Sequence, residues 1–186
     1  MALGTLLLGY FMMLNSTIGT ENLSIDVSID AIGVLLMISG AIQLKQYSGR
    51  FSQLFRCAAV MIPISVFFVV YGLKLWDGFD LPFFGILYQV LDLGWIILLC
   101  GLQFALFSAV GDIASQCELF VLEARLKICS KIGVVYAAVA LIYWGVCIAF
   151  PVLGDYSYYI RYLLYDLIIF FQSFYLFRAW REIAFV

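Results

Sequence analysis

The sequence predicts an all-α integral membrane protein, a six-transmembrane-helix bundle with both termini cytoplasmic. Of its 186 residues, 66% are apolar and only 12% are charged, whereas about 25% are charged in a soluble domain. The apolar residues fall into six runs, and the basic residues gather in alternate connections between them. This length leaves room for a single transmembrane domain, residues 1–186, and for no separate soluble domain.

Six segments approach the roughly 20 apolar residues that a spanning helix needs. The first has no basic residues ahead of it and no small-residue cleavage site, so we interpret it as a helix rather than a signal peptide. The second is the shortest, and the third contains Pro63. The predicted spans are residues 2–18, 29–44, 57–75, 83–110, 132–150 and 159–177.

Basic residues set the expected orientation. The connections on one side hold eight Lys and Arg residues, whereas those on the other side hold only Lys74 and Arg161. Because Lys and Arg accumulate in cytoplasmic loops, we expect a multi-pass protein of the cell membrane with both termini inside. The eight residues on the inner side are Lys45, Arg50, Arg56, Arg125, Lys127, Lys131, Arg178 and Arg181.

The longest connection, residues 111–131, is predicted to form an amphipathic helical segment on the inner side. Its apolar residues share one helical face, and Glu123 and Lys127 make a favourable pair four residues apart. It either lies on the inner leaflet or extends the fourth span. A plain connector is the main interpretation, and a surface for a protein partner is the alternative. The basic and aromatic loop 45–56 is a second candidate partner surface, although such loops commonly serve only as topological anchors.

Two carboxylates lie within apolar runs, Asp92 in the fourth and Asp166 in the sixth. A charge inside a membrane helix costs about 2.5–3.5 kcal/mol, so such residues face the bundle interior, lie at an interface or carry a function. Polar residues share a helical face with each carboxylate, which predicts an inward-facing intramembrane polar site. For Asp92, a helix start at the water interface remains open. The candidate site residues are Asp92, Asp166, Gln89, Gln103, Tyr88, Tyr162 and Ser173.

The composition argues against several function classes. Histidine is absent, which removes the commonest general base and metal ligand, and the five cysteines form no CxxC pair. We therefore expect no enzyme, no catalytic residues, no metal site and no cofactor. Tyr165-Asp166 resembles the YD motif of intramembrane aspartyl proteases, but their GxGD motif is missing, which argues against that family. A net charge of −2 also leaves no basic patch for nucleic acid.

The stretches LLLGYFMMLN and IDAIGVLLMISGAIQLKQYSGRF lie within the first predicted hairpin, about residues 6–51. They resemble the first hairpin of uncharacterised small multi-spanning membrane proteins of Gram-positive bacteria. Asp30 and Lys45-Gln46-Tyr47 match the pattern in that group, whereas its proline ahead of the second helix is absent here. The resemblance carries no activity with it.

Two function classes remain open. The first is a non-enzymatic membrane subunit that senses, regulates or scaffolds through its inner connections. The second is a small-solute or proton-linked transporter that uses Asp92 and Asp166. In both cases the lipid bilayer is a partner, and a protein partner would bind through 111–131 or 45–56.

Overall fold

The computed structural model describes residues 2–14, 17–20, 23–26, 29–72, 82–150 and 154–183. Within these residues the chain forms six helices and one two-stranded β-hairpin. Three of the described helices are long and apolar enough to cross a membrane, and two shorter helices are also apolar. The long apolar helices are α3 (Arg50–Gly72), α4 (Pro82–Gln116) and α5 (Phe120–Ala149), and the shorter ones are α1 (Ala2–Phe11) and α2 (Ile29–Leu44). The last helix, α6, covers Gly154–Ile183.

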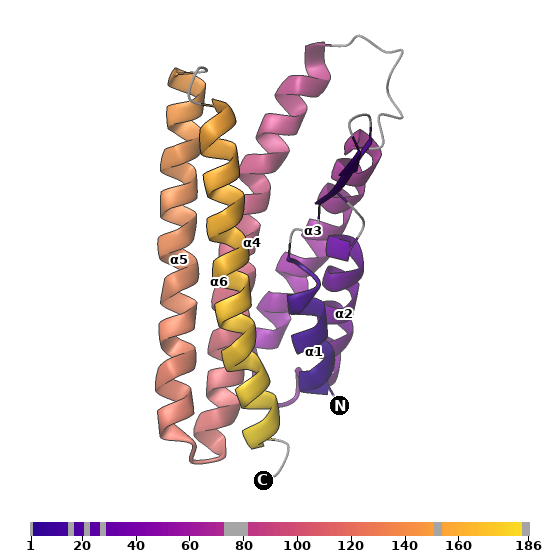
Figure 1. The fold of residues 1–186 in the computed structure, drawn as a ribbon. Helices are drawn as coiled ribbons and strands as arrows, with labels where there is room; N and C mark the ends of the chain where they lie inside the picture. The colour runs from indigo at the N-terminus through magenta and orange to yellow at the C-terminus, as the bar shows by residue number, and fades with distance from the viewer. Residues whose placement is uncertain are drawn as a thin grey trace.

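The helices run alternately up and down and pack as a ring (Figure 1). Each helix contacts the next one along the chain, α1 closes the ring against α6, and α4 also contacts α6. Consequently α1 begins and α6 ends at the same end of the bundle, beside the α2–α3 and α4–α5 connections (Figure 1). We name it the basic end, because these segments and the adjoining parts of α3 and α5 contain the eight Lys and Arg residues assigned above to the inner side.

The crossing of α1 and α2 depends on two glycines. A Cβ atom at Gly9 would lie 2.6 Å from the carbonyl oxygen of Gly33, and a Cβ atom at Gly33 would lie 2.6 Å from that of Gly9. No side chain fits at such a separation, so the two backbones come closer than any other residue pair would permit.

The predicted helical fold class is confirmed by the six described helices, but the first predicted span, 2–18, is wrong in its second half, where an unpredicted β-hairpin follows α1. Helix α1 ends at Phe11, and strand β1 (Thr17–Thr20) then pairs antiparallel with β2 (Leu23–Asp26). The sequence after α1 is rich in Asn, Ser and Thr, which compete with helical hydrogen bonds or favour strands. With 10 residues, α1 is about 15 Å long.

The later helices extend beyond their predicted limits at the basic end, whereas α2 matches the predicted 29–44. Helix α3 starts at Arg50 rather than at residue 57. Ser48 explains this start, because its Oγ accepts the backbone N–H of Arg50 at 3.2 Å and so satisfies a donor of the first turn. The uninterrupted apolar run begins only at residue 57, but the helix starts seven residues earlier, next to the Ser48 cap.

The predicted helical segment 111–131 is divided between two helices. Helix α4 continues to Gln116, and α5 begins at Phe120. Between them Glu118 has φ 59°, and the backbone N–H of Leu119 donates to the carbonyl of Ala114 at 2.8 Å. Many helices end in this way, with one residue in the left-handed conformation followed by an N–H that bonds to a carbonyl five residues earlier. The segment therefore extends the fourth span, as one alternative predicted, and also the fifth.

The outward faces of the long helices are strongly apolar. On α6, large exposed side chains recur at alternating spacings of three and four residues, which is the spacing of one helical face. A soluble monomer rarely exposes so large a continuous apolar surface. The exposed residues of this face are Ile160, Leu163, Leu167, Phe170, Phe174 and Phe177.

Candidate functional site

An ion pair joins α4 to α6 in the half of the bundle away from the basic end. Arg161 Nη1 lies 2.7 Å from Asp92 Oδ2, and Nη2 lies 3.0 Å from Oδ1. The guanidinium therefore holds both carboxylate oxygens in the bidentate geometry that gives strong, directional pairs. Each side chain is only 14% exposed. Each charge is thus compensated mainly by its partner rather than by solvent.

Tyrosines and a second carboxylate lie near this ion pair. Tyr136 on α5 interacts electrostatically with both of its members and with Asp166. The ring centroids of Tyr136 and Tyr165 are 6.0 Å apart. The Tyr165 hydroxyl donates a hydrogen bond to the carbonyl of Met13 at 2.8 Å, which ties α6 to the turn after α1. The half of the interior away from the basic end is therefore polar on α4, α5 and α6.

A chain of hydrogen bonds crosses the middle of the bundle. Gln103 Nε2 donates to the Tyr10 hydroxyl at 2.9 Å, and that hydroxyl donates to Gln172 Oε1. Gln172 Nε2 then donates to the carbonyl of Cys129 at 2.9 Å. The three polar side chains have no exposed surface. The chain therefore connects α4, α1, α6 and α5 in that order, with each donor matched to an acceptor.

Two buried atoms of this region have no hydrogen-bond partner among the described residues, Gln103 Oε1 and Ser173 Oγ. A Cβ atom at Gly133 would lie 2.4 Å from Gln103 Oε1. Glycine at position 133 is therefore what leaves room for the buried amide on α4. The geometry fixes how α4 and α5 are rotated against each other.

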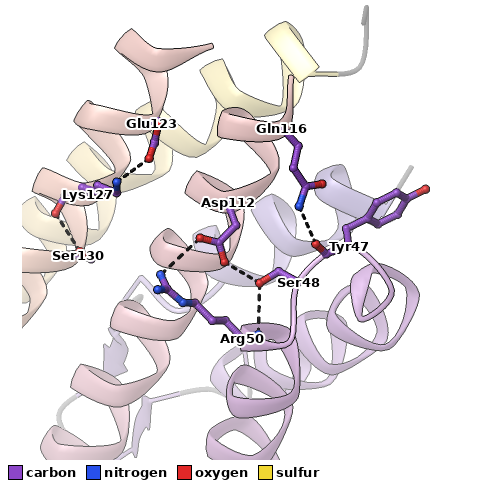
Figure 2. A network of polar contacts seen from close by, with 8 residues as sticks. All are labelled: Tyr47, Ser48, Arg50, Asp112, Gln116, Glu123, Lys127 and Ser130. Atoms are coloured by element: carbon purple, nitrogen blue, oxygen red, sulfur yellow. Dashed lines mark hydrogen bonds and ion pairs between the residues drawn. The ribbon is translucent and has the colours of Figure 1, made fainter. Parts of the chain in front are cut away.

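A second polar cluster lies at the basic end (Figure 2). The Ser48 hydroxyl donates to Asp112 Oδ2 at 2.7 Å, and Arg50 Nη1 lies 3.5 Å from Asp112 Oδ1. Gln116 Nε2 donates to the Tyr47 carbonyl at 3.1 Å. The loop 45–56 and the end of α4, predicted separately as candidate partner surfaces, are thus joined into one surface.

The structure distributes the predicted site residues over different environments. Asp92 and Asp166 are both half-buried, and Gln89 is exposed rather than facing the interior. The Tyr88 ring packs against Tyr71 of α3, with centroids 4.8 Å apart. Gln103 and Ser173 are buried, and the side chain of Tyr162 lies outside the described residues.

Sequence reasoning missed three residues of the polar interior. Arg161 lies five residues before Asp166, a spacing that disfavours a pair on one helix, and its partner Asp92 lies on another helix. Gln172 carried the same signal as Gln103, a single amide in an apolar run, and that signal identifies it. Tyr10 had no distinguishing signal, because tyrosine is common in membrane helices near interfaces.

Across the described parts of the chain, no group of three or more His, Cys, Asp or Glu side chains is arranged to hold a metal ion. No protein-family model, curated protein or solved structure matches this sequence.

Proposed function

We propose that this chain is a multi-pass membrane protein whose hydrocarbon-embedded part lies between two charge layers on α4. Asp92 and Asp112 are 20 residues apart on one continuous helix. This separation corresponds to about 30 Å, the thickness of the hydrocarbon core of a bilayer. Each carboxylate has an arginine partner, Arg161 at one layer and Arg50 at the other. The exposed apolar faces between the layers support this placement.

The basic end faces the cytoplasm in this proposal, so both termini do too. The support is the excess of eight Lys and Arg residues in its segments over the two on the other side. The six helices are all embedded, but α1 and α2 are about 15 Å and 24 Å long and reach less deeply than α3–α6. The backbone pairing of β1 with β2 supplies hydrogen bonds where helix is absent, as a membrane setting requires.

Within the membrane, the protein acts as a non-enzymatic subunit, a scaffold or regulator that binds another protein through its basic end. The observation that carries this proposal is the joining of the two candidate surfaces through Asp112 and Gln116. Beside this cluster, Tyr47, Phe120 and Val121 are 49%, 64% and 66% exposed. Large apolar side chains next to a fixed polar frame are typical of a protein contact.

A proton-linked or small-solute transporter is the second candidate. The buried polar chain and the half-buried Asp166 favour it, because ionisable residues inside membranes often mark transport pathways. Asp92 favours it less, since its charge is already compensated by Arg161. If the protein is a transporter, the Asp166→Asn variant folds normally and loses proton-linked activity. If the protein is a subunit, the same variant keeps its protein partner.

Cysteine labelling tests the orientation. Single cysteines at positions 78 and 155 in a variant without native cysteines should react with an impermeant reagent in intact cells. Cysteines at positions 47 and 118 should react only after permeabilisation. The reverse pattern would overturn the orientation without affecting the fold.

Purification of the intact assembly tests the role. A partner present at a fixed stoichiometry should be lost from Tyr47→Glu and Phe120→Glu variants and kept by Phe150→Glu, an exposed phenylalanine far from the basic end. Thermal unfolding of each variant shows whether it is still folded. If no partner is retained and a solute raises the melting temperature of the isolated protein, the transporter is favoured and the subunit proposal fails.

A further inference from the structure

We propose that four exposed cations on the sides of the basic end bind the headgroups of anionic phospholipids. They are Lys45 on the connection after α2, Arg56 on α3, Lys131 on α5 and Arg181 on α6. We name them the cation belt. The inference rests on the membrane placement proposed above and is independent of the proposed protein partner.

Five of the eight basic residues at the basic end are in no ion pair among the described residues, namely the four members of the cation belt and Arg125, which is only partly exposed. The end holds eight basic residues and four acidic ones, so its net charge is 8 − 4 = +4. Three of the carboxylates are engaged in ion pairs, Asp112 with Arg50, Glu123 with Lys127 and Glu182 with Arg178. Among the described residues, no ion pair includes a member of the cation belt, and each member is exposed.

Each cation of the belt lies among exposed apolar side chains. Lys131 has Ile128, Val134 and Val135 on the same outward side of α5. This pattern is that of a long cationic side chain whose stem lies along lipid while its head reaches the membrane surface. Since the surroundings are lipid-facing, the groups that reach the cation are those of lipids. The other exposed apolar neighbours are Ile42 for Lys45, Phe55 and Val60 for Arg56, and Phe177 and Trp180 for Arg181.

Arg56 and Lys131 lie farthest from the basic end among the four cations, and their side chains are directed back toward the headgroup layer. Arg56 follows Arg50 by six residues, about 9 Å along α3. Lys131 follows Leu126, which packs beside Gly111 near the inner charge layer, by five residues, about 8 Å along α5. Both helices begin at the basic end, and helical side chains tilt toward the N-terminus of their helix. Both heads are therefore directed back to the inner headgroups.

An acidic protein segment is the competing occupant, and the distribution of the belt disfavours it. Its members lie on four separate segments around the ring, so one bound segment could not contact them all. Phospholipids surround the whole ring, and an anionic leaflet attracts each basic residue near it. The excess of +4 then favours anionic over zwitterionic lipid.

Lipid selection by matched variants tests the inference. The protein is placed in nanodiscs of equal phosphatidylglycerol and phosphatidylcholine, and the lipids retained after mild detergent extraction are counted by native mass spectrometry. Wild type should retain more phosphatidylglycerol, and Lys131→Gln with Arg181→Gln should lower that enrichment by roughly fivefold per cation at most. The control, Lys127→Gln with Arg178→Gln, changes the same two helices by the same charge but neutralises cations that are already paired. It should lower the enrichment less than twofold.

Four results would overturn the inference. Equal retention of the two lipids by wild type would show no selection, and equal losses in both double variants would assign it to net charge alone. Displacement of phosphatidylglycerol by millimolar inorganic phosphate at constant ionic strength would assign the belt to a free anion. Loss of a stoichiometric protein from the belt variant would assign the belt to an acidic partner. Absence of lipid selection by the wild-type protein, together with retention of the partner that depends on Tyr47 and Phe120, would refute this inference and leave the proposed function intact.

Discussion

Arg161 and Asp92 are 69 residues apart in the sequence and form two nearly parallel hydrogen bonds between α6 and α4, at 2.7 and 3.0 Å. This pair explains why a carboxylate can stand in an apolar run of α4. Its charge is matched by a guanidinium that the chain brings from another helix, so neither group has to face lipid alone.

Removing one member of this pair should destabilise the protein more than removing both. Asp92→Asn should lower the free energy of unfolding by about 3 kcal/mol, because it leaves the arginine charge largely buried without its partner. The double variant Asp92→Leu with Arg161→Leu should lose clearly less. Unfolding by SDS titration in bicelles measures both, and equal losses in the two variants would contradict the interpretation.

Tyr10→Phe should lower the unfolding free energy by about 1–2 kcal/mol, since it leaves the amides of Gln103 and Gln172 without their shared partner. A double-mutant cycle with Gln103→Leu provides the control. The two losses should not add, because both changes break the same hydrogen bond. Losses that add within about 0.3 kcal/mol would mean that the chain does not act as a unit.

Gly9→Ala should destabilise the contact of α1 with α2 by about 1–3 kcal/mol, since the new Cβ would lie 2.6 Å from the Gly33 carbonyl oxygen. Gly94→Ala is the matched control, because apart from the adjacent backbone of α4 no atom of the described residues lies within 4 Å of its Cβ position. It should instead raise stability by up to about 1 kcal/mol through higher helix propensity. Thermal unfolding of the two variants should therefore shift in opposite directions.

Glu118→Gly should stabilise the protein by about 0.5–1 kcal/mol, because residue 118 has φ 59° and glycine adopts this left-handed conformation without a steric cost. Gln116→Gly is the control, as it places glycine in the last turn of α4 and should destabilise. Chemical denaturation compares the two. A loss of stability in Glu118→Gly would imply that the glutamate side chain makes a contact worth more than the strain.

The sequence predicted helices well and their ends less well. The apolar runs located all six helices, and α2 matches its predicted limits. The errors lie where a local hydrogen bond decides the boundary, such as the Ser48 cap of α3 and the turn at Glu118. These features have weak signals in composition, since a serine or glutamate serves equally well in many other settings.

The candidate site was predicted only in part, for a geometric reason. Helical spacing places Asp92 and Gln103 on faces of α4, but it gives no information on the height or rotation of α6 beside them. The partners Arg161 and Gln172 therefore could be identified only after α4 and α6 were packed together.

The sequence by itself determined that this protein is built of apolar helices and that its cations gather in alternate connections. Both properties depend only on which residues each segment contains, so they can be determined without knowing any tertiary contact. Only the tertiary structure decided that Asp92 meets Arg161, that Tyr10 joins Gln103 to Gln172, and that loop 45–56 joins α4. Each of these contacts is short and directional and joins residues distant in sequence, so it exists only at one relative rotation and height of the helices.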